Sequence, residues 1–255
     1  MFDSFQSEFL SFKIRKGGTG MDMINIGNMV LNNYLLKIPN GYMAIDTGYA
    51  GNFDRFCKRL KEKNIELKKI HYIFLTHAHD DHAGFLGKLL QTTDASAIVH
   101  KDSPQRLTLG HNLFIGGCPT SVAKAFFICM RIAGKGKHEF PAIDVSGRAI
   151  IWDGNGQPLR ERGIPLDILA LPGHTADSIG LLSDDGDLFC GDAAMNGFPS
   201  IKRTTIWIEN LKDYTGSWDS MIRSNAKTIY PSHGRLFPAS DLIKFRKFVD
   251  GITLR

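Results

Sequence analysis

Residues 76–84 restrict what this chain can fold into more than any other segment. They read Thr-His-Ala-His-Asp-Asp-His-Ala-Gly and directly follow an apolar run. Imidazole nitrogens and carboxylate oxygens suit zinc, iron or manganese. Because side chains alternate along an extended segment, His77, His79 and Asp81 are expected to point the same way. A turn would then direct His82 toward a second point, so the segment predicts ligands for two adjacent metal ions, with a polar surface turn as the alternative.

Three more residues that can bind metal also come just after short apolar runs: His174 after Leu166–Leu171, Asp192 after Leu188–Cys190 and His233 after Thr228–Tyr230. Runs of this length, bounded by Gly or Pro, are typical of buried strands. A side chain just beyond a strand end stands on a rigid element and faces a cleft, where a reactive site belongs. The combined set is too large for one tetrahedral ion and suits two: His77, His79, Asp81, His82, His174, Asp192 and His233.

The order of these motifs resembles that of the metallo-β-lactamase-fold hydrolases: Thr-His-x-His-x-Asp-His-x-Gly, Pro-Gly-His-Thr, Gly-Asp and Pro-x-His-Gly. The resemblance covers residues from about 22 to 251 and implies an α/β fold, a four-layer αββα sandwich. It also implies a metal assignment in which Asp192 bridges two ions, one held by His77, His79 and His174 and the other by Asp81, His82 and His233. Asp46, in Ile-Asp-Thr-Gly, matches the family's acidic residue beneath the site, which orients a ligand histidine without binding metal.

The internal pattern predicts a single domain over residues 1–255, built from two similar β-rich halves. Tyr42–Asp46 and Leu188–Asp192 each run from a strand into Asp. Ile70–His77 and Thr228–His233 each run from a strand into His. This faint repeat favours two halves covered by helices, with the metal ions in the cleft between them.

Apolar periodicity predicts the individual elements. Strands are expected over Met23–Leu31, Asn33–Ile38, Gly41–Ile45, Ile70–Leu75, Ala97–His100, Leu166–Leu171, Ile179–Ser183, Leu188–Cys190 and Thr228–Tyr230. Helices are expected over Asn52–Lys63, from near Gly84, over Ser121–Ala133 and over Ser240–Val249. The first three strands are separated by Asn and by Pro-Asn-Gly, which predicts an antiparallel meander.

Residues from about 103 to 150 fit the repeat poorly and are expected to form an insertion between the two halves. The insertion carries an apolar patch beside basic residues: Phe126, Phe127, Ile128 and Met130. One interpretation is a cap that contacts substrate over the cleft, and the alternative is an ordinary packing helix. His111 and His138 are expected to be structural or surface residues that would touch substrate only if the insertion folds over the cleft.

The expected function is a hydrolase that uses two divalent metal ions, zinc first and iron or manganese next. Two ions about 3.5–4 Å apart can bridge one hydroxide, because a bound metal lowers the pKa of water from about 15.7 toward 7. This hydroxide would attack a carbonyl or phosphoryl centre, and Asp81 would relay the proton to the leaving group. The alternative is a di-iron oxidoreductase similar to the flavodiiron proteins, acting on oxygen or nitric oxide with a separate electron donor.

Differences between this sequence and known subgroups of the family reduce the number of candidate substrate classes. True β-lactamases generally lack a bridging aspartate at the position of Asp192. Acyl-homoserine lactonases carry a tyrosine three residues later, where this chain has Met195. Glyoxalase II enzymes append a helical glutathione-binding domain after the last histidine, whereas this sequence ends soon after His233. What remains is a small-molecule ester, lactone, thioester or phosphodiester.

The net charge of +5 and the pI near 9.0 favour an anionic small molecule, although solvated lysines explain the same excess. Lys202, Arg203 and Trp207, in the loop after Asp192, are the candidate substrate contacts. No basic cluster interleaves aromatic residues, so no nucleic-acid partner is expected. No apolar stretch is long enough to span a membrane, so no membrane partner is expected either. The sequence does not predict an oligomeric state.

The four cysteines, Cys57, Cys118, Cys129 and Cys190, form no C-x-x-C pair. The first ten residues lack the basic region and apolar core of a secretory signal. Free thiols, a buried structural Cys190 and a cytoplasmic location are therefore expected.

Overall fold

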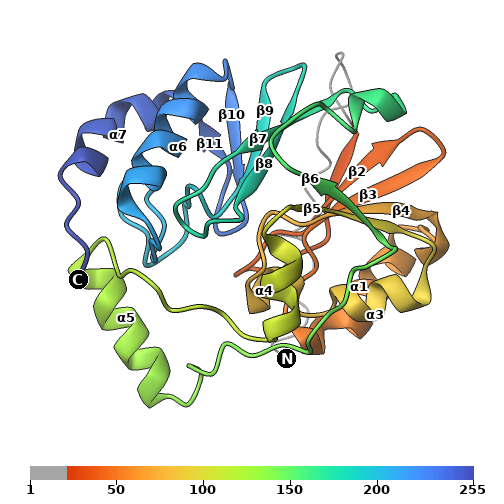
Figure 1. Cartoon of the computed structure of the whole chain (residues 1–255), viewed down its shortest axis with the longest axis horizontal. Helices are drawn as coiled ribbons and strands as arrows, with labels where there is room; N and C mark the ends of the chain where they lie inside the picture. Colours follow the sequence, from red (N-terminus) through yellow and green to blue (C-terminus); the bar gives the residue numbers. More distant parts are fainter. Residues whose placement is uncertain (1–21) are drawn as a thin grey trace, which may run out of the picture.

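Two β-sheets face each other in the middle of the molecule, and helices cover the outer face of each sheet (Figure 1). This computed structural model describes residues 22–255, so the first ten residues, where no secretory signal is expected, lie outside the described part. The first sheet has the order β1-β2-β3-β4-β5-β6, with bounds Met23–Asn25, Tyr34–Ile38, Gly41–Ile45, Ile70–Phe74, Ser96–His100 and Ala149–Trp152. The second has the order β11-β10-β9-β8-β7, with bounds Phe237–Pro238, Thr228–Pro231, Asp187–Gly191, Ile179–Ser183 and Leu166–Ala170.

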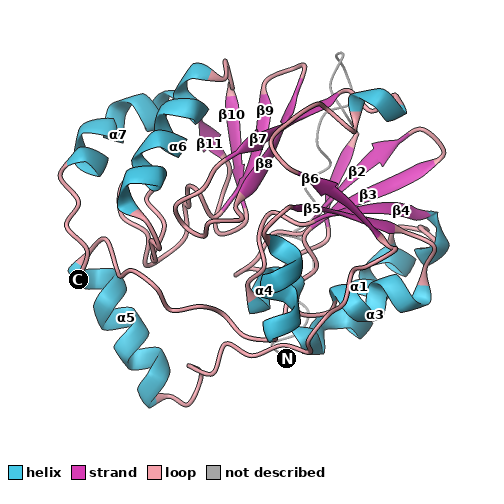
Figure 2. Ribbon diagram, in the orientation of Figure 1, coloured by secondary structure: helices cyan, strands magenta, loops and turns pink. Residues whose placement is uncertain are grey.

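Helices lie on opposite sides of the paired sheets (Figure 2). The four that build the outer layers are α1 and α3 on the first sheet and α6 and α7 on the second, with bounds Phe53–Glu62, Leu86–Thr92, Leu211–Arg223 and Ser240–Asp250. The others are α2, α4 and α5, with bounds Asp80–Ala83, Ser103–Leu109 and Ser121–Ile132. Single 3-10 turns cover Ala50–Asn52, Leu67–Lys69 and Arg160–Arg162. The result is the expected four-layer αββα sandwich.

Both faces of each sheet are buried, and neighbouring residues along a strand enter different apolar layers. In β2, Leu35 packs toward the first helical layer and Leu36 packs between the sheets. In β9, Leu188 packs toward the second helical layer and Phe189 packs between the sheets. This double burial explains why the strands appear in the sequence as short continuous apolar runs rather than as alternating patterns.

The faint internal repeat is confirmed by the sheet topology. In the first half, β1, β2 and β3 are joined as antiparallel neighbours, and β3 then pairs with β4 in parallel. In the second half, β7, β8 and β9 are joined as antiparallel neighbours, and β9 pairs with β10 in parallel. The two halves therefore share one strand order and one set of directions. The antiparallel meander expected for the first three strands is present, and β7, β8 and β9 form a second one.

The first strand is shorter than the sequence predicts. It ends at Asn25, and the chain then turns, because the Asn28 side chain accepts hydrogen bonds from the backbone N–H groups of Val30 and Leu31 at 2.7 and 2.9 Å. These bonds replace the strand's ladder with a local turn. A second difference is the presence of further elements, since the strands β6 and β11 and the helices α2, α4 and α6 were not predicted.

The residues between β5 and β6 extend outside the sandwich and contain α4 and α5 (Figure 1). This segment is called the excursion below. Helix α5 begins with the Thr120 side chain accepting a hydrogen bond from the Ala123 backbone N–H at 3.1 Å, which caps the helix. Of its side chains only Ala123 is buried, so this helix is not a core element. Two backbone hydrogen bonds between Cys118 and Arg255 tie the segment before α5 to the end of the chain.

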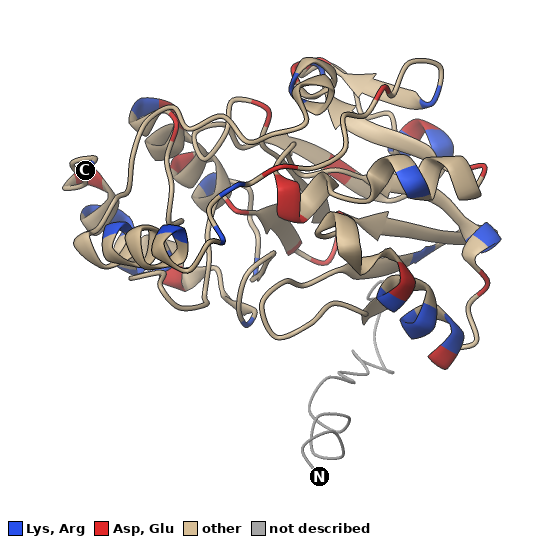
Figure 3. Ribbon diagram, turned by 90° about the horizontal axis from the view of Figure 1, so that it is seen from below, with Lys and Arg blue, Asp and Glu red and all other residues tan. Residues whose placement is uncertain are grey.

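Basic and acidic positions are spread over several helices rather than gathered along one face (Figure 3). Within residues 22–255, no helix is both long and apolar enough to cross a membrane.

Candidate metal centre

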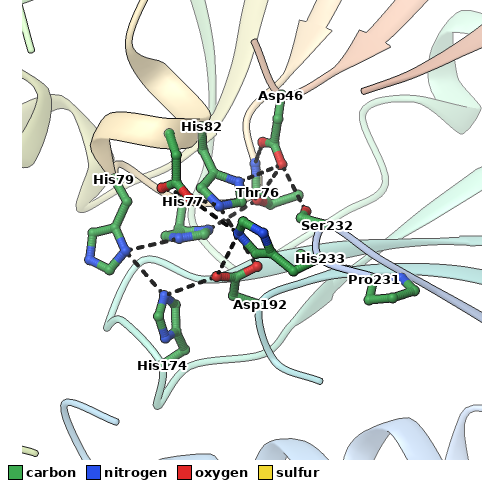
Figure 4. Close-up of polar contacts among 12 residues, drawn as sticks. Asp46, Thr76, His77, His79, His82, His174, Asp192, Pro231, Ser232 and His233 are labelled. Atoms are coloured by element: carbon green, nitrogen blue, oxygen red, sulfur yellow. Dashed lines mark hydrogen bonds and ion pairs between the residues drawn. The ribbon is translucent and has the colours of Figure 1, made fainter. Parts of the chain in front are cut away.

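The candidate ligands come from four strand ends that meet at one edge of the paired sheets (Figure 4). The segment 76–82 leaves β4, His174 lies in the turn after β7, Asp192 directly follows β9, and His233 follows β10. The backbone allows this close approach only at small residues. At Gly173, which has a φ of +126°, a Cβ would lie 2.2 Å from the backbone nitrogen of Tyr214. Glycine is therefore required immediately before His174.

Three histidines converge on one point. The Nδ1 atom of His79 lies 3.2 Å from Nε2 of His77 and 3.1 Å from Nε2 of His174. Side chains of all three are buried, and Nε2 of His79 has no hydrogen-bond partner. Three ring nitrogens this close cannot all be satisfied by sharing protons with one another, so the arrangement fits a bound cation.

A second group forms beside the first. The Asp81 carboxylate lies 3.1 Å from Nε2 of His233 and 3.5 Å from Nε2 of His82. Asp192 stands between the two groups, with its oxygens 3.5 Å from His233 and 3.7 Å from both His82 and His174. One Asp192 oxygen, Oδ1, is buried without a hydrogen-bond partner.

The structure thus brings all seven candidate ligands together. Three sets of ligand atoms lie within 4.8 Å of one another: His77, His79 and His174; His77, His82 and Asp192; and Asp81, His82 and His233. The first and third sets are those that the resemblance implies for the two metal ions. Asp192 lies where a bridging ligand is expected.

Polar contacts hold three of the ligand rings, those of His174, His233 and His82, on the side away from the cluster. His174 Nδ1 donates to the Trp207 carbonyl oxygen at 2.8 Å, and His233 Nδ1 donates to the Val30 carbonyl oxygen at 2.8 Å. His82 Nδ1 lies 2.8 Å from the Asp46 carboxylate. A proton held on the outer nitrogen leaves the inner nitrogen free to bind metal, so these contacts select the tautomer that a ligand histidine needs.

Asp46 is fully buried beneath the cluster. Its carboxylate accepts hydrogen bonds from the Thr76 backbone N–H at 2.7 Å and from the Thr76 hydroxyl at 2.8 Å, and the Ser232 hydroxyl lies 3.2 Å away. It therefore holds the start of the histidine segment, the ring of His82 and the residue before His233 in one arrangement. That position agrees with the role implied for it, since it contacts a ligand histidine from outside the cluster.

The pKa values of the first histidine group favour the neutral form. Burial lowers the pKa of His77 and of His79 well below the usual value, and neighbouring histidines lower both further. Neutral imidazole is the form that binds metal, so these rings need little or no deprotonation before they bind.

The pKa values of the second group favour a negatively charged carboxylate beside positively charged histidines. Burial opposes ionisation of Asp192, but His233 and His82 lower its pKa to about 2. Burial likewise opposes protonation of His233, but Asp192 and Asp81 raise its pKa to about 9. Burial also lowers the pKa of His82, but Asp81, Asp46 and Asp192 outweigh burial and raise this pKa well above the usual range. A divalent cation would take over the charge balance that these two histidines supply by holding protons.

Asp177 is a functional candidate that the sequence analysis missed. It is fully buried, and one carboxylate oxygen accepts hydrogen bonds from the Ala78 backbone N–H at 3.0 Å and from the Ser103 hydroxyl at 2.8 Å. Because Ala78 lies between His77 and His79, this contact positions the histidine segment. The signal in the sequence is an acid three residues after His174, which is easily overlooked because it follows no apolar run.

Two of the three candidate substrate contacts lie elsewhere. Arg203 pairs with Asp241 at 2.8 Å, and the Lys202 ammonium lies 4.5 Å from the ring centroid of Phe248. Both residues adopt positive φ, which turns this part of the loop toward α7. The structure therefore places Lys202 and Arg203 outside the lining of the cavity at the cluster, whereas Trp207 lines it.

That cavity has a volume of about 380 Å³. Five side chains of the cluster form part of its wall: His79, Asp81, His174, Asp192 and His233. Most of the other lining residues are apolar or aromatic and come from the loop after β1, the excursion between β5 and β6, and the loop after β9. Such a cavity is the usual form of a small-molecule site.

Fold and site together define an α/β sandwich with a buried cluster of histidines and aspartates positioned to bind metal ions. The family model of the metallo-beta-lactamase superfamily matches residues 27–233. The chain therefore belongs to the metallo-beta-lactamase superfamily.

Similar proteins agree with this membership. The chain is 28% identical over 205 residues to a beta-lactamase-like protein 2 homolog of Caenorhabditis elegans, covering 80% of this chain and 55% of that protein. It is 27% identical over 219 residues to the thioesterase pkgB of Emericella nidulans, covering 82% of this chain and 48% of that protein. The chain thus spans about half the length of these two curated relatives.

Among solved structures, a metallo-beta-lactamase of Cronobacter sakazakii, a mutant in its HARLDQ motif, superposes with a TM-score of 0.64. The alignment covers 90% of this chain and 89% of that one at 17% sequence identity, and at this identity the likeness shows a shared fold.

Proposed function

We propose that this protein is a metal-dependent hydrolase of a small-molecule ester, lactone, thioester or phosphodiester, and that it works with two divalent metal ions, most readily zinc. The observation that carries the proposal is the convergence of seven ligand-capable side chains in a member of this superfamily. The similarity to a protein named as a thioesterase supports thioesters among the candidate substrates.

His77, His79 and His174 would hold one ion, Asp81, His82 and His233 would hold the other, and Asp192 would bridge them. When bound, such ions polarise the bond under attack and lower the pKa of water toward 7. Asp46 and the carbonyl oxygens of Trp207 and Val30 hold the outer Nδ1 atoms of His82, His174 and His233, so that the inner Nε2 atoms of these rings point into the cluster.

Asp81 is the residue we assign to proton transfer. Its carboxylate lies at the cavity wall, beside the imidazole of His233, and is the least buried of the cluster's carboxylates. In the proposed reaction it accepts a proton from the attacking water and passes it to the leaving group. The apolar parts of the cavity exclude bulk water around this exchange.

The free thiols of all four cysteines support a reducing, cytoplasmic location as part of the same proposal.

Metal content and a hydrolysis screen test the proposal together. We expect purified protein to contain about two equivalents of metal and to hydrolyse at least one class in a panel of esters, thioesters, lactones and phosphodiesters. His77→Ala and Asp192→Ala should each lose metal and lower kcat/KM by a factor of roughly 1,000 or more, because each removes a ligand.

His71→Gln serves as the matched control, because His71 lies on β4 and contacts the Asn40 carbonyl oxygen at 3.0 Å, outside the cluster. Iron in the purified protein together with oxygen uptake would instead support the di-iron alternative. Metal-free protein, or full activity in His77→Ala, would refute the proposal.

A further inference from the structure

Six rings form a continuous aromatic wall along one side of the cavity. In order of contact they are Phe198, Phe126, Phe127, Trp207, Phe114 and His138. Centroids of successive rings are 5.1 to 6.3 Å apart, and every successive pair meets edge to face. Edge-to-face contact leaves ring faces available to a further aromatic or apolar group.

The aromatic wall is assembled from two segments far apart in the sequence. Residues between β5 and β6 supply four of the rings, and the loop after β9 supplies Trp207 and Phe198. The indole Nε1 of Trp207 donates to the Ile115 carbonyl oxygen at 2.8 Å. Gly117 and Ile208 also exchange two backbone hydrogen bonds of 3.0 and 2.9 Å. These bonds fasten the excursion to the loop.

Trp207 also fixes the wall relative to the metal cluster. Its side chain belongs to the wall, and its carbonyl oxygen accepts the hydrogen bond from His174 Nδ1. A group resting on the wall therefore lies at a defined distance from the cluster. This coupling is what a site needs in order to present one particular bond of a larger molecule to reactive groups.

Two rings of the aromatic wall are exposed although they are apolar. Phe198 is 83% exposed and Phe114 is 51% exposed, and Met29, on the cavity rim, is 81% exposed. Large apolar side chains gathered around a cavity are typical of ligand sites rather than of ordinary surface.

The charges around the cavity argue against an anionic group at the wall. Among the described residues that line it there is no Lys or Arg. The Asp80 carboxylate, which also lines the cavity, is held by Asn112 at 2.7 Å and by His138 at 3.5 Å. The basic residues of α5, Lys124 and Arg131, are exposed and do not line the cavity. The one imidazole of the wall, His138, is already paired with Asp80, so an anion lying on the wall would lose water without gaining an unpaired cationic side chain among the described residues.

We propose that the aromatic wall binds a bulky, uncharged aromatic acyl group, and that the substrate is the ester or thioester of such a group. The acyl ring would lie against Phe127 and Trp207, with the bond to be broken beside Asp81 and Asp192. The part of this inference that concerns hydrolysis rests on the proposed function, and the part that concerns binding does not. A cavity of about 380 Å³ is within the range that holds a drug-sized ligand.

A binding experiment tests the wall without catalysis. The probe is N-phenyl-1-naphthylamine, a neutral aromatic fluorophore, titrated into protein with and without a metal chelator. We expect saturable binding in both conditions, and Phe127→Ala should raise the Kd about tenfold or more, which is the usual effect of removing apolar surface from a binding pocket. The matched control is Ile128→Ala, because Ile128 is on the same helix, is 52% exposed and does not line the cavity.

A kinetic experiment tests the substrate class with three thioesters of one thiol, carrying the 2-naphthoyl, acetyl and succinyl groups. We expect kcat/KM to be at least about tenfold higher for naphthoyl than for either of the others, and Phe127→Ala to lower the naphthoyl-to-acetyl ratio about tenfold. Ile128→Ala should leave that ratio unchanged.

The two experiments separate the possible failures. Absence of turnover with every thioester, together with fluorophore binding that Phe127→Ala weakens, would remove the proposed function and leave the neutral aromatic site in place. Turnover that is equal for the three thioesters, or fluorophore binding that is equal in wild type and Phe127→Ala, would overturn the assignment of the wall. A preference for the succinyl thioester would replace it with an anionic substrate.

Discussion

Each ligand histidine outside the His77–His79 pair depends on an oxygen from a distant part of the chain. Val30 lies about two hundred residues before His233, and Trp207 lies 33 residues after His174. The contacts run through backbone carbonyl groups in both cases. A carbonyl is the same in every residue type, so the sequence carries no signal for these two roles. The side chain of Asp46, in contrast, stands in a recognisable motif, and the structure places it against His82.

Asp46→Asn tests this orienting role at the residue scale. The amide can still accept the hydrogen bond from Thr76, but it removes the negative charge that holds His82 in the metal-binding tautomer. We expect a loss of zinc affinity of roughly 10- to 100-fold, the usual effect of removing an outer partner of a ligand histidine. Competition with a chromophoric chelator measures the affinity.

Asp94→Asn is the control for this substitution, since Asp94 is exposed and precedes β5, at the end of the sheet opposite to the one where the histidine segment leaves the parallel strand β4. Zinc affinity equal to that of the wild type in Asp46→Asn would show that Asp46 has no orienting role.

At the scale of elements, short apolar runs were sufficient to predict most strands. Both faces of each sheet are buried, so the strand sequences are continuously apolar. It failed where local side chains decided the conformation. The Asn28 turn ends β1 early. Strand β6 was missed although it is a continuous apolar run, because the predicted insertion extended over its first residues. Short helices such as α4 carry too few turns to show a period.

The excursion between β5 and β6 depends on Gly116. This residue has a φ of +89°, and a Cβ there would lie 2.0 Å from the Ile208 carbonyl oxygen, at the junction that carries the aromatic wall. Gly116→Ala should therefore separate the excursion from the loop and destabilise the protein by more than the backbone term of about 1 kcal/mol.

Gly134→Ala isolates that backbone term. Gly134 has a φ of +71° and no atom within 4 Å of a built Cβ, so the substitution adds strain without a clash. Denaturant unfolding should show a larger loss for Gly116→Ala than for Gly134→Ala, and hydrogen exchange should increase over residues 113–130 only in the former. Equal losses would mean that the junction does not hold the excursion.

At the scale of the molecule, a largely buried ionic contact joins the two halves. Arg106, in α4, forms two hydrogen bonds of 2.7 and 2.8 Å with Glu209 and lies 3.5 Å from Asp177. Glu209 also accepts a hydrogen bond from the Ala176 backbone N–H at 2.9 Å. This contact connects the first half to the turn that carries His174.

Arg106→Met should lower the free energy of unfolding by about 3 kcal/mol, because it leaves the carboxylates of Glu209 and Asp177 buried without their cation. Arg59→Met removes the corresponding partner of an exposed pair, Arg59 with Glu62 at 3.3 Å, and should cost below about 1 kcal/mol. Urea unfolding of both variants, with zinc content checked in parallel, measures the difference. Similar losses in the two variants would show that the buried contact does not couple the halves.

The sequence alone was enough to identify the superfamily, the two-fold strand pattern and the seven side chains of the cluster. These features can be recognised from short stretches of sequence, because each ligand comes soon after a strand, and each strand is marked by a run of apolar residues. Only the tertiary structure showed the remaining features. These are the carbonyl contacts of Val30 and Trp207 with the ligand rings, the position of Asp177, the direction of Lys202 and Arg203 and the aromatic wall. Each of them joins segments that share no local pattern, and only the packing of the two halves brings such segments into contact.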